Sequence, residues 1–184
     1  MKKVFIIHGF QGSPNGGWRP WLMGELEKQN VYACALAMPD PNNPTPHAWV
    51  QEIARHVESN SRDHIYLVGH SLGVPAILLY LEKTKAKNVK GIVLVSGPFL
   101  KTTKKLSEFL KKPFECKAIK SKTKHIVVIH GSNDDLVPPE EGTALAKALD
   151  ATLIIIKNGG HLNGSSGWLK LPQCLTSLER MMKT

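Results

Sequence analysis

Short apolar runs rich in β-branched residues alternate along the chain with longer segments in which apolar residues recur every three or four positions. The short runs predict strands at residues 3–8, 31–37, 64–69, 90–96, 125–130 and 152–157. The longer segments predict helices at residues 18–30, 46–60, 72–83, 139–150 and 172–183. Several strands are apolar almost throughout, as strands covered on both faces are. This alternation predicts the α/β class, with a mostly parallel central sheet and helices on both faces.

The spacing of the predicted elements indicates one domain. No internal repeat, low-complexity tract or linker divides residues 1–184, and a chain of 184 residues with 42% hydrophobic content can bury one core. The longest gap between strands, residues 97–124, is predicted to hold a short helix at 103–111. That gap is too short for a separate domain, so no large lid is expected.

A serine stands between two glycines where a predicted strand meets a predicted helix. The stretch GHSLG, residues 69–73, matches the GxSxG nucleophile elbow, in which the serine occupies a tight, strained turn that bulky neighbours would obstruct. Taken alone, Ser71 could simply cap the following helix, because serine is a common N-cap. The strand before it and the helix after it favour the elbow.

Two later strand ends supply the partners that a serine nucleophile needs, namely a base and a carboxylate that orients the base. Asp134 and Asp135 follow one strand, and His161 follows the next. The order serine, aspartate, histidine is that of the α/β-hydrolase fold, and open α/β sheets place their sites at the carboxyl ends of strands. Each residue has an ordinary alternative role in a turn or surface loop, but their joint occurrence in this order favours catalysis.

The choice between the two aspartates depends on loop register. The phrase G-x-x-D-x-x-V-P, residues 131–138, favours Asp134 as the acid. Asp135 stays the alternative, since a shift of one residue in the loop would exchange the two side chains.

Attack on a carbonyl also creates an oxyanion, which needs backbone N–H donors already in place. One donor is expected from Leu72, directly after the serine. The other is expected from Phe10 or Gln11, in the glycine-rich loop after the first strand, although such a loop can also be a plain turn.

The net charge of +9 is concentrated between residues 83 and 124, where only Glu108 and Glu115 oppose the lysines. Those lysines are Lys83, Lys85, Lys87, Lys90, Lys101, Lys104, Lys105, Lys111, Lys112, Lys117, Lys120, Lys122 and Lys124. The region has no arginine and few aromatic residues for stacking on bases, so no nucleic-acid partner is expected. A solvated face is the favoured interpretation, and docking of a protein or an anionic surface is the alternative.

Cysteine and histidine spacing argues against a metal or a disulfide scaffold. Cys34, Cys116 and Cys174 are widely separated and form no CxxC pair, which favours a reducing, cytoplasmic setting. The eight histidines include no HExxH or comparable spacing, so no metal and no other cofactor is expected. The sequence contains no run of eighteen apolar residues, so no membrane span is expected.

Several short phrases together resemble a known family. They are HGFQGSP, MPDP, Trp49, GHSLG, VSG, GSNDDLVP and GGHLN. The chain resembles the small single-domain α/β-hydrolases grouped with retinoblastoma-binding protein nine, from the first strand to the last histidine, with the lysine-rich segment least matched. The resemblance implies a triad of Ser71, His161 and either Asp134 or Asp135, and an esterase-like activity on small acyl substrates.

From the residues and the resemblance together we expect a carboxylesterase-like serine hydrolase that works through an acyl-enzyme and takes a small acyl substrate. Two alternatives use the same features of the chain. One is a hydrolase-like scaffold that mainly binds a protein or an anionic surface through residues 83–124. The other is an acyltransferase with the same triad.

Overall fold

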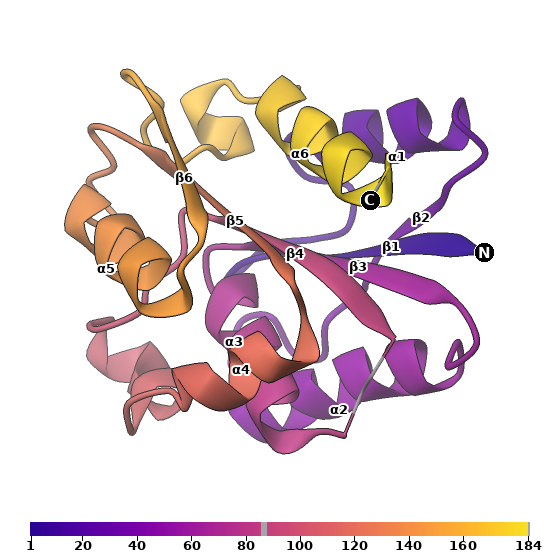
Figure 1. Ribbon diagram of the computed structural model, residues 1–184. Helices are drawn as coiled ribbons and strands as arrows, with labels where there is room; N and C mark the ends of the chain where they lie inside the picture. The colour runs from indigo at the N-terminus through magenta and orange to yellow at the C-terminus, as the bar shows by residue number, and fades with distance from the viewer. Residues whose placement is uncertain (86–87, 184) are drawn as a thin grey trace.

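The computed structural model describes residues 1–85 and 88–183, and it contains a parallel sheet (Figure 1). Lys87 and the side chain of Lys105, both counted in the lysine-rich region, lie outside this description. Within it the sheet has six strands, in the order β2-β1-β3-β4-β5-β6, and each neighbouring pair is parallel. The strands are β1 (Lys2–Ile7), β2 (Tyr32–Ala35), β3 (His64–His70), β4 (Val89–Val95), β5 (His125–Gly131) and β6 (Thr152–Ile156). The predicted α/β class and strand positions are therefore confirmed.

Helices cover both faces of the sheet, as the apolar strands require. Figure 1 shows α1 and α6 on one face and α2, α3, α4 and α5 on the other. The α-helices are α1 (Arg19–Glu27), α2 (Pro46–Glu58), α3 (Gly73–Lys83), α4 (Cys116–Lys122), α5 (Pro139–Leu149) and α6 (Pro172–Lys183). Two 3₁₀ helices, η1 (Lys104–Leu110) and η2 (Gly164–Ser166), lie in loops.

Two details of residues 97–124 differ from the sequence prediction. The short helix expected at 103–111 is the 3₁₀ helix η1, and the helix α4 was not predicted. Helix α4 has only seven residues, of which Ile119 alone is buried, so its apolar spacing is too brief to indicate a helix.

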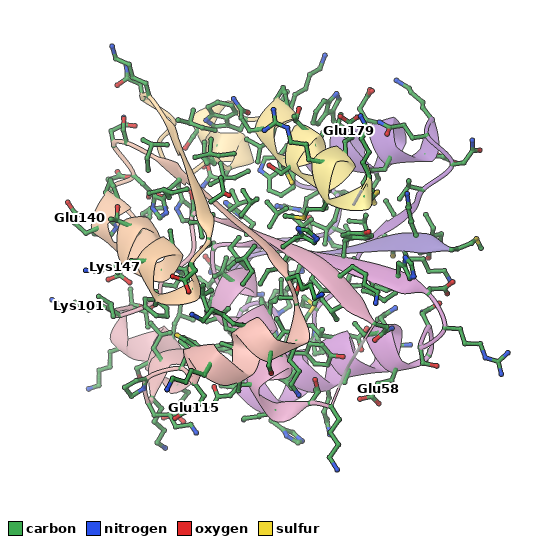
Figure 2. The ribbon with its side chains drawn as sticks, in the orientation of Figure 1. Glu58, Lys101, Glu115, Glu140, Lys147 and Glu179 are labelled. Carbon is green, nitrogen blue, oxygen red and sulfur yellow. The ribbon has the colours of Figure 1, made fainter. Side chains whose placement is uncertain are left out.

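The sheet separates two apolar clusters. The larger contains Trp49 of α2, most of α3 and Leu145 of α5, and the smaller contains Leu22 of α1 and Leu178 of α6. Charged side chains point outward from the helices and loops around these clusters (Figure 2). In residues 1–85 and 88–183, no helix has the length and apolar character needed to cross a membrane.

Strand order determines where a site can form. The chain order reverses beside β1, which pairs with both β2 and β3. After β1 the chain leads to α1 on one face, whereas after β3 it leads to α3 on the other face (Figure 1). Such a reversal opens a crevice at the carboxyl ends of the strands, where open α/β sheets bind ligands.

Candidate active site

Ser71 lies at this crevice, directly between β3 and α3, in a strained backbone conformation. Its φ is +53°, in the left-handed region that non-glycine residues seldom adopt. The Ser71 N–H donates to the carbonyl of Val95 at 2.9 Å, and the Val74 N–H donates to the Ser71 carbonyl at 3.0 Å. The turn is therefore held from both sides, as a nucleophile elbow requires.

Glycines make this turn sterically feasible. A Cβ at Gly73 would lie 2.3 Å from the carbonyl oxygen of Ile7, so α3 starts in backbone contact with β1. A Cβ at Gly9, in the loop after β1, would lie 2.8 Å from the Cβ of Ser71. The requirement at Gly9 cannot be read from the GxSxG pattern, because it arises from a contact between distant segments.

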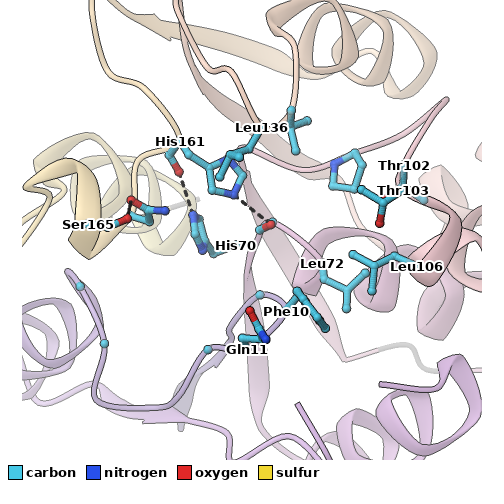
Figure 3. A pocket seen from close by; sticks show the side chains of 18 of the residues that line it. Phe10, Gln11, His70, Leu72, Thr102, Thr103, Leu106, Leu136, His161 and Ser165 are labelled. Atoms are coloured by element: carbon cyan, nitrogen blue, oxygen red, sulfur yellow. Dashed lines mark hydrogen bonds between the residues drawn. The ribbon is translucent and has the colours of Figure 1, made fainter. Parts of the chain in front are cut away.

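The structure brings Ser71, His161 and Asp134 into one hydrogen-bonded chain. The Oγ of Ser71 lies 3.0 Å from Nε2 of His161 (Figure 3). The Nδ1 of His161 lies 2.9 Å from Oδ2 of Asp134. A carboxylate can only accept, so Nδ1 carries the proton and Nε2 is left to accept one from the serine.

Asp134 is buried, at 4% exposed, and is prepared to stay ionised. Burial would raise its pKa, but hydrogen bonds from His161 and from the backbone N–H groups of Val137 and Leu136 hold the pKa below its usual value. Those amides donate to Oδ1 at 2.9 and 3.0 Å. Asp135, by contrast, is exposed. The geometry thus places Asp134, and not Asp135, beside His161.

The backbone around His161 is anchored by two side chains that the sequence did not single out as site residues. The Nε2–H of His70 donates to the His161 carbonyl at 3.0 Å, and the indole N–H of Trp18 donates to the next carbonyl, that of Leu162, at 2.8 Å. His70 is the variable position of GxSxG, so the motif gives it no role. Both contacts span long stretches of sequence, and a sequence pattern carries no signal for them.

Burial of His70 predicts an acid-sensitive fold. Burial lowers its pKa from 6.5 to about 3, so the unfolded chain binds more protons than the folded chain between these values. The free energy of unfolding should therefore fall as the pH falls, by an amount on the order of 3 kcal/mol between pH 6.5 and 4. Urea denaturation across this range should show a shallower pH dependence in His70→Asn. His47→Asn removes an exposed imidazole. If it reduced the pH dependence of the free energy of unfolding as much as His70→Asn does, the acid sensitivity could not be assigned to His70.

The predicted oxyanion donors lie near the nucleophile, and one of them is otherwise engaged. Leu72, Phe10 and Gln11 line the same cavity as Ser71. The Gln11 N–H already donates to the carbonyl of Pro41 at 2.9 Å. The choice between Phe10 and Gln11 as the second donor, beside Leu72, stays a prediction. The MPDP phrase, which ends at Pro41, thus has a structural role in bracing the loop after β1.

The cavity in front of Ser71 has a volume of about 780 Å³, within the range of small-molecule sites. Figure 3 shows two sides to it. Leu72 and Leu106 lie on one side together with Thr102 and Thr103, whereas Ser165 lies on the other.

Glu141 fixes one wall of this cavity. It is buried in the first turn of α5, and its Oε2 accepts hydrogen bonds from the N–H groups of Phe99, Leu100 and Lys101 at 2.7, 2.6 and 3.3 Å. Sequence reasoning missed this residue, because acids in a first helical turn are usually exposed and favourable for the helix dipole. Glu141 instead holds the segment after β4 against the site.

No metal-binding group is apparent among residues 1–85 and 88–183, where no three His, Cys, Asp or Glu side chains gather in a suitable way. The absence of a cofactor stays a prediction.

Comparison with known proteins agrees with this geometry. Residues 4–180 match the family described as "Serine hydrolase". "Putative hydrolase YdeN" of Bacillus subtilis (strain 168) is 37% identical over 174 residues, which cover 93% of this chain and 91% of that one. "Serine hydrolase RBBP9" of Rattus norvegicus is 26% identical over 169 residues, or 89% and 88% of the two chains.

Solved structures give the same result for the fold. The crystal structure of the ydeN gene product from B. subtilis superimposes with a TM-score of 0.93 at 34% identity and covers 100% of both chains. Est1E from Butyrivibrio proteoclasticus, at 17% identity, has a TM-score of 0.74 over 97% of this chain and 88% of that one, a likeness of fold alone. Because the family match spans almost the whole chain, this protein belongs to the serine hydrolase family and is an enzyme of the hydrolase class.

Proposed function

We propose that the protein is a carboxylesterase-like hydrolase that cleaves small acyl esters through Ser71, His161 and Asp134. The observation that carries this proposal is the continuous hydrogen-bonded chain from Ser71 Oγ through the His161 ring to the Asp134 carboxylate. The serine end of this hydrogen-bonded chain faces a cavity large enough for a small ester.

The first half of the reaction forms the acyl-enzyme. Ser71 Oγ attacks the ester carbonyl carbon while Nε2 of His161 takes the hydroxyl proton. Asp134 stabilises the imidazolium through Nδ1–H. The N–H groups of Leu72 and Phe10 donate to the oxyanion, and the alcohol leaves with the proton from His161 as the carbon–oxygen bond breaks.

The second half reverses these roles with water. Nε2 of His161 removes a proton from a water molecule, which attacks the acyl carbon and forms a second oxyanion. The bond to Ser71 Oγ then breaks, and His161 returns its proton to the serine. The products are one carboxylic acid and one alcohol, and the chemistry requires no cofactor.

The cellular setting is inferred from the cysteines. Cys34, Cys116 and Cys174 are all free. Free thiols without a disulfide framework are usual in a reducing compartment, which supports a cytoplasmic location.

Covalent labelling tests the proposed nucleophile. A fluorophosphonate probe should label the wild-type protein once, and mass mapping should place the label on the peptide that contains Ser71. Hydrolysis of p-nitrophenyl esters of increasing chain length then reports the size of the acyl site. Failure of both labelling and hydrolysis would contradict the proposal, and ester or amide products formed with an added alcohol or amine would assign acyl transfer instead.

A further inference from the structure

A buried cation lines the candidate active site without a counter-ion. Arg19, the first residue of α1, lines the cavity that contains Ser71 and His161, and it is only 6% exposed. Its Nε–H donates to the carbonyl of Ser13 at 2.9 Å. In the described part of the chain, Arg19 forms no salt bridge with any carboxylate.

This position is electrostatically unfavourable for a lone guanidinium. Burial lowers the pKa of Arg19 to about 10, which still leaves the group charged at neutral pH. Arg19 also begins a helix, at the positive end of the helix dipole, and the first turn of α1 contains no acidic residue. A buried positive charge at such a position destabilises the fold unless an anion pairs with it.

The surrounding residues accommodate the guanidinium but do not neutralise it. A Cβ at Gly16 would lie 2.4 Å from Nη2 of Arg19, so the guanidinium packs against the backbone of this loop. The Trp18 ring lies 6.0 Å from Cζ. Burial lowers the pKa values of His8 and His70, and the charge of Arg19 lowers them further, so both rings are neutral near it.

We infer that Arg19 binds a carboxylate of the substrate, so that the preferred esters carry a negative charge on the acyl or alcohol part. This inference rests on the proposed esterase function. Arginine presents paired N–H donors that match the two oxygens of a carboxylate. The loop before Arg19 lies beside η2, since a Cβ at Gly17 would be 3.1 Å from the N of Gly164. The charged arm of the substrate therefore lies on the Ser165 side of Figure 3, and the uncharged arm lies against Leu72 and Leu106.

Matched pairs of esters test the inference on both parts of the substrate. Mono-4-nitrophenyl adipate and 4-nitrophenyl hexanoate differ by a carboxylate on the acyl part, and 4-acetoxybenzoate and phenyl acetate differ by one on the alcohol part. In at least one of the two pairs, the wild type should favour the charged ester. There, the ratio of kcat/KM for the charged ester to that for the neutral ester should be about 10- to 100-fold lower in Arg19→Met than in the wild type. Arg19→Lys should recover part of the ratio, because it keeps the charge and loses the paired geometry.

The design separates this inference from the esterase proposal. Because each ratio is taken within one variant, partial loss of folded enzyme cancels. An unchanged ratio in both pairs, with neutral esters still hydrolysed, would overturn the role of Arg19 alone. If the wild type hydrolyses no ester, the proposed function itself fails. Lys101→Met removes an exposed cation from the same cavity, and an equal fall there would show that general charge, and not Arg19, attracts the anion.

A second cavity carries an independent inference. It has a volume of about 890 Å³ and lies at the opposite edge of the sheet, beside the starts of β1, β3, β4 and β5. The lining lysines are Lys2, Lys85, Lys90, Lys122, Lys124 and Lys183. Among the described residues, no acid lines this cavity. The neighbouring Asp63 is already paired with Lys3 and the N-terminal amino group.

A buried hydroxyl accompanies these charges. Thr123 lines the cavity, is 3% exposed, and its Oγ1 has no hydrogen-bond partner in the described structure. Among the described residues, Lys2 and Lys122 donate only to the backbone carbonyls of Met182 and Thr84, and neither pairs with a carboxylate. We propose that this cavity, called the lysine cavity, binds a small polyphosphate anion, which gives part of the lysine-rich region a specific role.

Calorimetric titration with inorganic tripolyphosphate at 150 mM salt tests the lysine cavity. One ion should bind per chain, and Lys90→Gln combined with Lys124→Gln should weaken binding about tenfold or more. Thr123→Val should also weaken it. Lys104→Gln combined with Lys111→Gln removes two exposed lysines from outside the cavity as the control. The proposal would be overturned if both double variants lost the same affinity for tripolyphosphate, or if tripolyphosphate bound at several weak sites. It would also be overturned if an RNA oligomer bound and tripolyphosphate did not.

Discussion

Ser71→Ala is expected to lower kcat for ester hydrolysis about 10⁶-fold and to abolish fluorophosphonate labelling. The reason is geometric, because the only hydroxyl that His161 Nε2 contacts in the described residues is Ser71 Oγ, at 3.0 Å. Alanine also tolerates the left-handed backbone at this position no worse than serine, so the fold should persist. Steady-state kinetics, with circular dichroism to verify folding, measures the effect.

Ser96→Ala is the matched control for this change. Ser96 follows β4 as Ser71 follows β3, and it has a similar positive φ of +46°. Its buried hydroxyl has no hydrogen-bond partner among the described residues, and Ser96 does not line the cavity in front of Ser71. Loss of this hydroxyl should leave kcat and labelling near wild type. Labelling that persists in Ser71→Ala, or disappears in Ser96→Ala, would contradict the nucleophile assignment.

The sheet and the three strand-end side chains could be predicted from sequence, because parallel strands place their carboxyl ends at one edge. Once β3, β5 and β6 are recognised from their apolar runs, Ser71, Asp134 and His161 must lie near that edge. Their order in the chain then limits the chemistry to few choices. This is why local patterns were sufficient for the outline of the site.

Features that depend on contacts between loops could not be predicted in this way. The choice of Asp134 over Asp135 depends on how one loop rotates, and that rotation is fixed by hydrogen bonds to Leu136 and Val137. Arg19 stands at a helix start, where a charged residue is normally solvated, yet it is buried against the preceding loop, where its Nε–H donates to the Ser13 carbonyl. No periodicity in the sequence carries this information.

The same limit applies to residues that position others. Glu141 occupies a helix position that is usually exposed, and its role is visible only when the segment after β4 folds over it. His70 lies inside a motif whose pattern leaves its position open. Both residues act through backbone atoms of remote segments, so the side-chain types alone give no signal.

Asp134→Asn is expected to lower kcat about 10⁴-fold while the fold is kept. The Asn carbonyl oxygen can still accept the Leu136 and Val137 N–H groups that Oδ1 accepts now, at 3.0 and 2.9 Å. That orientation directs the amide NH₂ at Nδ1 of His161, which must then become an acceptor. The proton moves to Nε2, and the ring can no longer take the proton of Ser71.

Asp135→Asn is the matched control, since it makes the same chemical change one residue along the same loop. Because Asp135 is exposed, the kcat of the Asp135→Asn variant should stay within about twofold of the wild-type value. Thermal denaturation should show both variants folded, and kcat measured over a range of pH separates a lost base from a lost fold. If kcat fell strongly in Asp135→Asn while Asp134→Asn stayed active, the loop would have to be shifted by one residue in solution. In that case the hydrogen bonds from Leu136 and Val137 would have to move with it, because they fix which carboxylate faces the imidazole.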